Sequence, residues 1–272
     1  MDFKNTFDIM VNNTAKYLVD NELKCMVLGI SGGIDSTLTA CICREVSAKT
    51  NIPLIGVSLP CSSNAECENE SARKTMEAFC DEYWVENLQK EYLLMKATCE
   101  QHVESTDISQ GNIKARLRAI YLYNIASVRH GIVMDTDNLT EHYLGFMTIS
   151  GDVFDLNAIG CLWKHEIFQM VKFLADELFF QDDKAYDALI TAYNMVPTDG
   201  NGVKAGGDLA QIAPGSTFEE VDAILGEYLL SGEVTGEYPN STVDRVISRH
   251  KATEYKRLGH PINVVYRSEI II

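Results

Sequence analysis

The residues best suited to chemistry in this 272-residue chain form one short stretch, Gly29-Ile30-Ser31-Gly32-Gly33-Ile34-Asp35-Ser36. Two adjacent glycines let backbone N–H groups crowd one point, because no Cβ blocks them. A helix that begins at the end of the stretch would add unpaired N–H donors and the positive end of its dipole. Ser31 and Ser36 would add hydroxyl donors. The stretch therefore predicts a cradle for phosphate.

The carboxylate of Asp35 is unexpected beside a bare phosphate, since like charges repel. A divalent cation between them would resolve the repulsion, because proteins commonly hold Mg²⁺ with one or two carboxylates and phosphate oxygens. No Gly-Lys-Ser/Thr follows the glycines, so the stretch is not a Walker A sequence. The competing interpretation is an ordinary Gly-Gly turn in an α/β protein.

A second stretch, Gly111–Arg118, places three cations within five residues of an acidic chain. Lys114 and Arg118 are four residues apart and would share one face of a helix, whereas Arg116 would project elsewhere. A solvated basic face is the usual explanation for such a run. An anion-binding role becomes the better hypothesis once the next stretch is considered.

A third stretch joins a predicted strand, 131–135, to an acidic helix start, Thr136-Asp137-Asn138-Leu139-Thr140-Glu141. The carboxyl ends of parallel strands meet at one edge of a sheet, so this stretch would lie beside the glycine loop. Glu141 is then placed to share a metal ion with Asp35. Asp137 would be its partner on one helical face, although an acidic first turn is also ordinary compensation of the helix dipole.

These stretches need a scaffold, which the hydrophobic pattern indicates. Strands are predicted at 25–30, 53–59, 83–87 and 131–135, and helices at 3–24, 36–49, 64–80, 88–104, 111–128 and 218–225. Asn64 is expected to cap the helix that follows it. Alternating strands and helices predict an α/β fold, a doubly wound parallel sheet with flanking helices.

Composition narrows the classes of function. The formal net charge of −16 would repel nucleic acid and anionic membranes, so we expect neither as a partner. The eight cysteines form no Cys-x-x-Cys pair, which gives a zinc or iron–sulfur site little support. We see no signal peptide and no apolar run of membrane-spanning length. We therefore expect a cytoplasmic protein with reduced thiols.

The order of the three stretches resembles that of the NAD⁺ synthetase family. The matching motifs are Gly-Ile-Ser-Gly-Gly-x-Asp-Ser, Gly-Asn-Ile-Lys-Ala-Arg-x-Arg and Thr-Asp-x-x-x-Glu-x-x-x-Gly-Phe-x-Thr. The first of them resembles the pyrophosphate loop of the N-type ATP pyrophosphatase superfamily. The resemblance implies an adenine nucleotide alpha hydrolase-like fold, and it runs from about residue 25 to the C-terminus.

The resemblance also implies a reaction. ATP would adenylylate the nicotinate carboxylate of deamido-NAD⁺ and release pyrophosphate, with Mg²⁺ as cofactor and ATP as co-substrate. Ammonia would then displace AMP to give NAD⁺. We expect one synthetase domain over 1–272 without a glutaminase domain, so free ammonia or a partner amidotransferase would supply nitrogen. A homodimer is implied, because the substrate site of the family lies at the subunit interface.

Carried over position by position, the resemblance assigns roles to individual residues. The expected ATP contacts are the 29–36 loop, Thr136, Lys164 and Thr198. The expected Mg²⁺ ligands are Asp35 and Glu141, which with Lys164 form the expected catalytic set. The expected deamido-NAD⁺ contacts are Arg116, Asp155, Tyr255 and Lys256.

The chain departs from the family pattern at three places. Ile149 stands where the bacterial ammonia-dependent enzymes have a substrate-binding Lys, Asp208-Leu209 replaces the frequent Asp-Glu, and Tyr255 replaces the usual His. For the tail pair, the alternative to Tyr255-Lys256 is His250-Lys251; the spacing to Pro261-Ile262 favours the former.

A glycine-rich stretch, 197–208, is expected to be a mobile loop that closes over the substrate. Two rival classes of function stay open. Another pyrophosphate-loop enzyme such as GMP synthetase should carry a different block in place of Asn112–Arg118, and a tRNA thiolase should be basic. A non-catalytic nucleotide sensor should lack the Asp35–Glu141 carboxylate pair.

Overall fold

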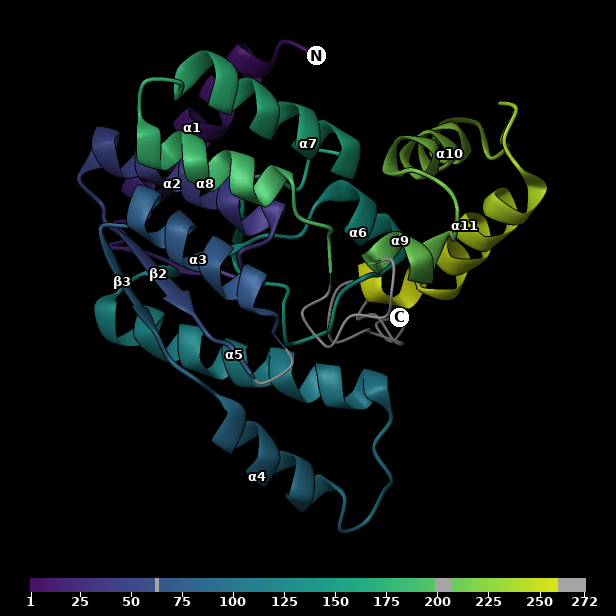
Figure 1. Cartoon of the computed structure of the whole chain (residues 1–272), viewed down its shortest axis with the longest axis horizontal. Coiled ribbons are helices and arrows are strands. Elements are labelled where there is room, and N and C mark those ends of the chain that lie inside the picture. Colours follow the sequence, from purple (N-terminus) through teal and green to yellow (C-terminus); the bar gives the residue numbers. More distant parts are fainter. Residues whose placement is uncertain (62–63, 199–206, 259–272) are drawn as a thin grey trace, which may run out of the picture.

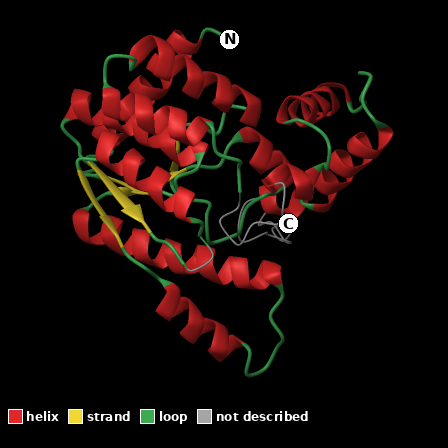
Figure 2. Ribbon diagram, viewed as in Figure 1, coloured by secondary structure: helices red, strands yellow, loops and turns green. Residues whose placement is uncertain are grey.

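A parallel β-sheet forms the centre of the computed structural model, which describes residues 1–61, 64–198 and 207–258 (Figure 2). Its strands within these ranges are β1 (Met26–Gly29), β2 (Leu54–Ser58), β3 (Glu82–Val85), β4 (Ile132–Asp135) and β5 (Leu156–Asn157). They lie in the order β3-β2-β1-β4-β5, and every pairing is parallel. The predicted fold class is therefore confirmed.

Helices cover both faces of the sheet (Figure 1). On one face lie α1 (Phe3–Asp20), α2 (Ile34–Thr50), α3 (Glu66–Phe79), α7 (Lys164–Phe173), continued by a π-helical turn (Leu174–Leu178), and α8 (Asp183–Tyr193); on the other lie α4 (Gln89–Cys99) and α5 (Asp107–Arg129). Met26 and Leu28 of β1 pack in the first core, and Val27 packs in the second. Burial on both faces explains why the central strands are apolar throughout.

A smaller core lies beside the sheet and borders the carboxyl ends of its strands. It is formed by α6 (Leu139–Leu144), α9 (Gly207–Ile212), α10 (Phe218–Ser231) and α11 (Asn240–Ala252), followed by a 3₁₀ turn (Glu254–Arg257). Leu144, Val221 and Val246 are fully buried there. No helix in the described part of the chain has both the length and the apolar character needed to cross a bilayer.

Several expected boundaries are wrong, and local capping explains why. The helix expected from Ser36 begins at Ile34, because Gly33 takes the extended backbone of an N-cap (φ −74°, ψ 164°). Asn64 does not cap α3; Ala65 occupies the N-cap, and the Asn64 side chain instead accepts the backbone N–H of Cys61 at 3.0 Å.

The third correction concerns the turn after β4. Asn138 is the N-cap of α6, and its side-chain oxygen accepts the backbone N–H of Glu141 at 3.0 Å. The helix therefore begins at Leu139, and Asp137 lies before it rather than on a helical face with Glu141.

Candidate active site

The loop after β1 is held tightly against α3. Gly32 has φ +87°, and a Cβ there would lie 2.3 Å from the backbone oxygen of Glu68, so only glycine fits. The Ser71 hydroxyl donates to the Gly32 carbonyl at 2.7 Å. The other members of the 29–36 loop line a cavity of about 710 Å³. The first turn of α2 thus borders the cavity with its N-terminus, the arrangement that favours anions.

Three charged side chains from separate elements meet beside this loop. The Lys164 ammonium lies 2.5 Å from Asp35 Oδ2 and 3.1 Å from Glu141 Oε1. Asp35 follows β1 and Glu141 follows β4, which are neighbours in the sheet, and Lys164 is the first residue of α7. Both acids are therefore close enough to share one cation, as expected from their place after neighbouring parallel strands.

Burial controls the charge state of this cluster. The Lys164 side chain is only 3% exposed. Burial alone would lower the pKa of Lys164, but the carboxylates of Asp35 and Glu141 outweigh it and raise that pKa, so the ammonium stays charged. Burial raises the pKa of Glu141 to about 7, against the opposing effect of Lys164.

Further acidic side chains surround the pair. Burial, followed by repulsion from Asp135, Glu141 and other acids, raises the pKa of Asp137 well above its usual value. Such a concentration of acids fits a cation. Within the described ranges no three His, Cys, Asp or Glu side chains form a ready metal site. A metal held by Asp35 and Glu141 would therefore need further oxygen ligands, which phosphate supplies.

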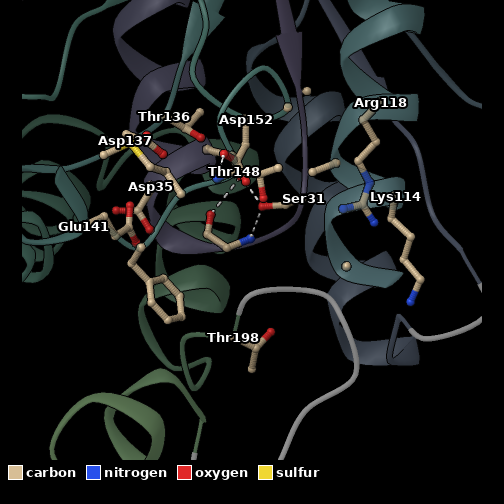
Figure 3. A pocket seen from close by; sticks show the side chains of 18 of the residues that line it. Ser31, Asp35, Lys114, Arg118, Thr136, Asp137, Glu141, Thr148, Asp152 and Thr198 are labelled. Carbon is tan, nitrogen blue, oxygen red and sulfur yellow. Dashed lines mark hydrogen bonds between the residues drawn. The ribbon is translucent and has the colours of Figure 1, made fainter. Parts of the chain in front are cut away.

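Two cations from α5 line the cavity on the side away from these acids, as Figure 3 shows. The Lys114 ammonium lies 5.0 Å from the centre of the Tyr92 ring, and Arg118 Nε donates to the Leu59 carbonyl at 3.1 Å. Arg116 is exposed, and its guanidinium donates to the Ile149 carbonyl at 3.2 Å. Helical spacing thus predicted that Lys114 and Arg118 share a face, and this face lines the cavity, whereas the family resemblance selected Arg116 between them.

The remaining ATP positions also border the cavity. Thr136 and Thr198 both line it, and Thr198 Oγ1 donates to Glu68 Oε1 at 2.6 Å. Glu68 was not singled out from the sequence, because it reads as an ordinary acidic residue in the first turn of a helix.

The expected deamido-NAD⁺ contacts are dispersed. The Asp155 carboxylate does not line the cavity and accepts the Tyr123 hydroxyl at 3.1 Å. Lys256 lines the cavity, with its ammonium donating to the Gly145 carbonyl at 2.8 Å, whereas Tyr255 is half exposed and lies away from the cavity lining.

The alternative tail residue, His250, bonds the Tyr143 carbonyl at 2.9 Å outside the cavity lining. Residues 199–206 of the glycine-rich loop and the Pro261-Ile262 pair lie outside the described residues.

The parallel sheet, the glycine loop at its carboxyl edge and the adjoining cavity define an α/β protein with the adenine nucleotide alpha hydrolase-like fold. The sequence matches the family described as NAD synthase over residues 7–259, so the chain belongs to that family. The resemblance stated from the motifs is thereby confirmed.

Individual relatives agree with this assignment. The NH(3)-dependent NAD(+) synthetase of Syntrophomonas wolfei is 28% identical over 247 residues, which is 88% of each chain. The solved NMN synthetase from Francisella tularensis superimposes with a TM-score of 0.80 at 24% identity, over 97% of this chain and 100% of that one. The NH3-dependent NAD synthetase from Campylobacter jejuni gives 0.73 at 22% identity, with the same coverage.

Proposed function

We propose that this protein is an ammonia-dependent NAD⁺ synthetase that uses ATP to convert deamido-NAD⁺ into NAD⁺, AMP and pyrophosphate. Membership of the NAD synthase family supports the overall reaction. The observation that carries the mechanism is the meeting of Asp35, Glu141 and Lys164 beside the glycine loop in one cavity.

The phosphate end of the cavity, formed by the 29–36 loop, Asp35, Glu141, Lys164 and the two threonines, would hold ATP. The N-terminus of α2 and the hydroxyls of Ser31 and Ser36 would bind the phosphates that leave as pyrophosphate. Thr136 and Thr198 would contact the nucleotide. Lys164 would neutralise charge that accumulates on the departing phosphates.

The chemistry needs positioning more than a covalent nucleophile. A nicotinate carboxylate oxygen attacks the α-phosphorus, and the bond to the bridging oxygen breaks with its electrons passing to pyrophosphate. Ammonia then adds to the activated carbonyl carbon, the bond to AMP breaks, and a proton is lost to give the amide. Holding the reactants together supplies most of the acceleration.

The convergence of Asp35 and Glu141 fits a divalent cation as well as it fits an ammonium ion, so we propose these two as the ligands of Mg²⁺. When bound, Mg²⁺ would offset phosphate charge and polarise the α-phosphorus. The acids around the site, Asp137 among them, would strengthen the attraction for a cation.

Lys114 and Arg118 line the part of the cavity that we call the acid-substrate end. Their positive charges would attract the anionic substrate in this otherwise acidic chain. Arg116, Asp155 and Tyr255 would contribute only through a second subunit, so we also propose a homodimer. Arg116 lies four residues before the exposed Ile120, on one face of α5.

Exposed apolar side chains support pairing through α4 and α5. They are Leu93, Leu94, Met95, Ile108, Ile120, Tyr123 and Val128. The eight unpaired thiols in turn support a reducing compartment, and we propose the cytoplasm.

The formation of NMN is a second candidate, favoured by one observation. The assigned dinucleotide contacts Arg116 and Asp155 lie outside the cavity lining, and Ile149 offers no charge. A cavity with fewer contacts suits the smaller nicotinate mononucleotide.

One assay separates the candidates. The protein is incubated with ATP, Mg²⁺ and ammonium and with deamido-NAD⁺, nicotinate mononucleotide or XMP, and pyrophosphate and the amide product are measured. We expect the highest kcat/KM with deamido-NAD⁺. Preference for nicotinate mononucleotide would establish the second candidate, and no turnover with either nicotinate compound would refute both.

A further inference from the structure

The four carboxylate oxygens of Asp35 and Glu141 each already accept a hydrogen bond. Asn138 Nδ2 donates to Asp35 Oδ1 at 2.9 Å, and the Asn138 backbone N–H donates to Glu141 Oε2 at 3.2 Å. The Lys164 ammonium donates to the other two oxygens, Asp35 Oδ2 at 2.5 Å and Glu141 Oε1 at 3.1 Å. Asn138 therefore fixes one oxygen of each acid, and Lys164 bridges the pair that remains.

The contacts from Asn138 do not depend on Lys164, because the position of Asn138 is fixed by the fold. Its side chain is fully buried and forms the N-cap of α6, so it stays in place whatever cation is present. The two oxygens that face Lys164 are thus held toward a common point independently of Lys164. The position between these two oxygens suits a cation, and the Lys164 ammonium occupies it.

Lys164 has features of a cation that can be exchanged. Its ammonium borders the cavity in which phosphate is expected, and it lies 5.8 Å from the centre of the Phe218 ring. The two carboxylates and the ammonium leave a net negative charge, whereas a divalent cation in place of the ammonium would neutralise both carboxylates fully. An incoming polyphosphate offers the ammonium another set of oxygens.

We propose that Lys164 is an internal counter-ion that occupies the metal position until ATP draws its ammonium onto the phosphates. The proposal rests on the proposed metal role of Asp35 and Glu141. It predicts that the protein binds a divalent cation weakly without nucleotide and tightly with it, so that metal and ATP enter together.

Mn²⁺ binding, measured by electron paramagnetic resonance in the absence of nucleotide, tests this directly. Lys164→Met removes the ammonium with little change in volume and should tighten Mn²⁺ binding about tenfold or more, the size of a typical coupling between sites. Lys172→Met, on the same helix but exposed, is the matched control and should bind Mn²⁺ as the unmodified protein does.

A second variant covers the case in which Lys164→Met does not fold. Lys164→Gln keeps a hydrogen-bond donor beside the acids and should show the same increase in Mn²⁺ affinity. Combining it with Asp35→Asn should abolish this increase. Folded variants, judged by circular dichroism, that bind Mn²⁺ no more tightly than the unmodified protein would overturn the proposal. Tight binding of Mn²⁺ by the unmodified protein without nucleotide would do so as well.

A separate experiment tests whether Asp35 is a metal ligand at all. It measures Mn²⁺ binding in the presence of a non-hydrolysable ATP analogue. There the unmodified protein should bind Mn²⁺ tightly, and Asp35→Asn should not. Equal binding by these two proteins would show that the metal assignment is wrong, independently of how the Lys164 variants behave.

Discussion

At the phosphate end of the cavity the residues selected by the sequence motifs lie together, whereas the assigned deamido-NAD⁺ contacts are mostly elsewhere. Asp35, Glu141 and Lys164 form one bonded cluster. Arg116 is exposed, and Asp155 is engaged with Tyr123 outside the cavity lining.

The difference follows from how each end is built. The phosphate end comes from loops that leave adjacent parallel strands, so short contiguous motifs are brought together by the sheet itself. The acid-substrate end depends on which face of one long helix meets the cavity. It also depends, in our proposal, on a second subunit. The structure therefore brings the predicted phosphate residues together, whereas the predicted deamido-NAD⁺ contacts stay on separate elements.

The largest effect is expected at the phosphate end. Asp35→Ala removes one of the two acids that meet Lys164, and ATP–pyrophosphate exchange should fall by about a thousandfold, as for loss of other strong electrostatic contacts. Asp155→Asn is the comparison variant and should retain most of the exchange rate. A fully active Asp35→Ala enzyme would contradict the claim that the phosphate end carries the adenylylation step.

A smaller effect is expected at the acid-substrate end. Lys114→Met or Arg118→Met should raise KM for deamido-NAD⁺ roughly tenfold to a hundredfold, because each would remove a charged hydrogen bond. KM for ATP should change little. If Arg116→Met raised KM while the other two variants did not, the family assignment would be correct and the helix-face argument wrong.

The dimer proposal sharpens the comparison. Ile120→Asp places a charge on the apolar face of α5 and should convert a dimer into monomers, measured by sedimentation velocity. A parallel fall of several-fold in kcat/KM is expected, because the outward-facing Arg116 would lose access to a partner site. An unmodified protein that sediments as a monomer at micromolar concentration would contradict it.

The last effect concerns stability rather than catalysis. Burial raises the pKa of Asp152 to about 6, from a usual 3.8, although its bond from the Thr148 N–H opposes the shift. The folded state therefore holds this proton more tightly than the unfolded state, so the contribution of Asp152 to stability is fully present below about pH 4 and is lost as the pH rises to about 6. Between these limits the unmodified protein should lose roughly 3 kcal/mol relative to Asp152→Asn.

Urea unfolding of both proteins at about pH 4 and about pH 8 measures this difference. Parallel pH profiles would show that burial does not raise the pKa of Asp152.

Much of this architecture was predictable from the sequence. The alternation of apolar strands and amphipathic helices gave the parallel sheet, and the glycine loop gave the phosphate end. Asn138 was not identified, although Asn-x-x-Glu is the pattern of a capping box, because its second contact, to Asp35, joins residues 103 positions apart. The packing of Gly32 against Glu68 could not be predicted either, because these residues are also far apart in the sequence.

The central claim is that the substrate carboxylate is activated by adenylylation, and isotope transfer tests it most directly. Deamido-NAD⁺ labelled with ¹⁸O in the nicotinate carboxylate is turned over with ATP, Mg²⁺ and ammonium, and the AMP is examined by mass spectrometry. We expect one ¹⁸O atom in each AMP formed. AMP without the label, or ADP as the product, would contradict the account.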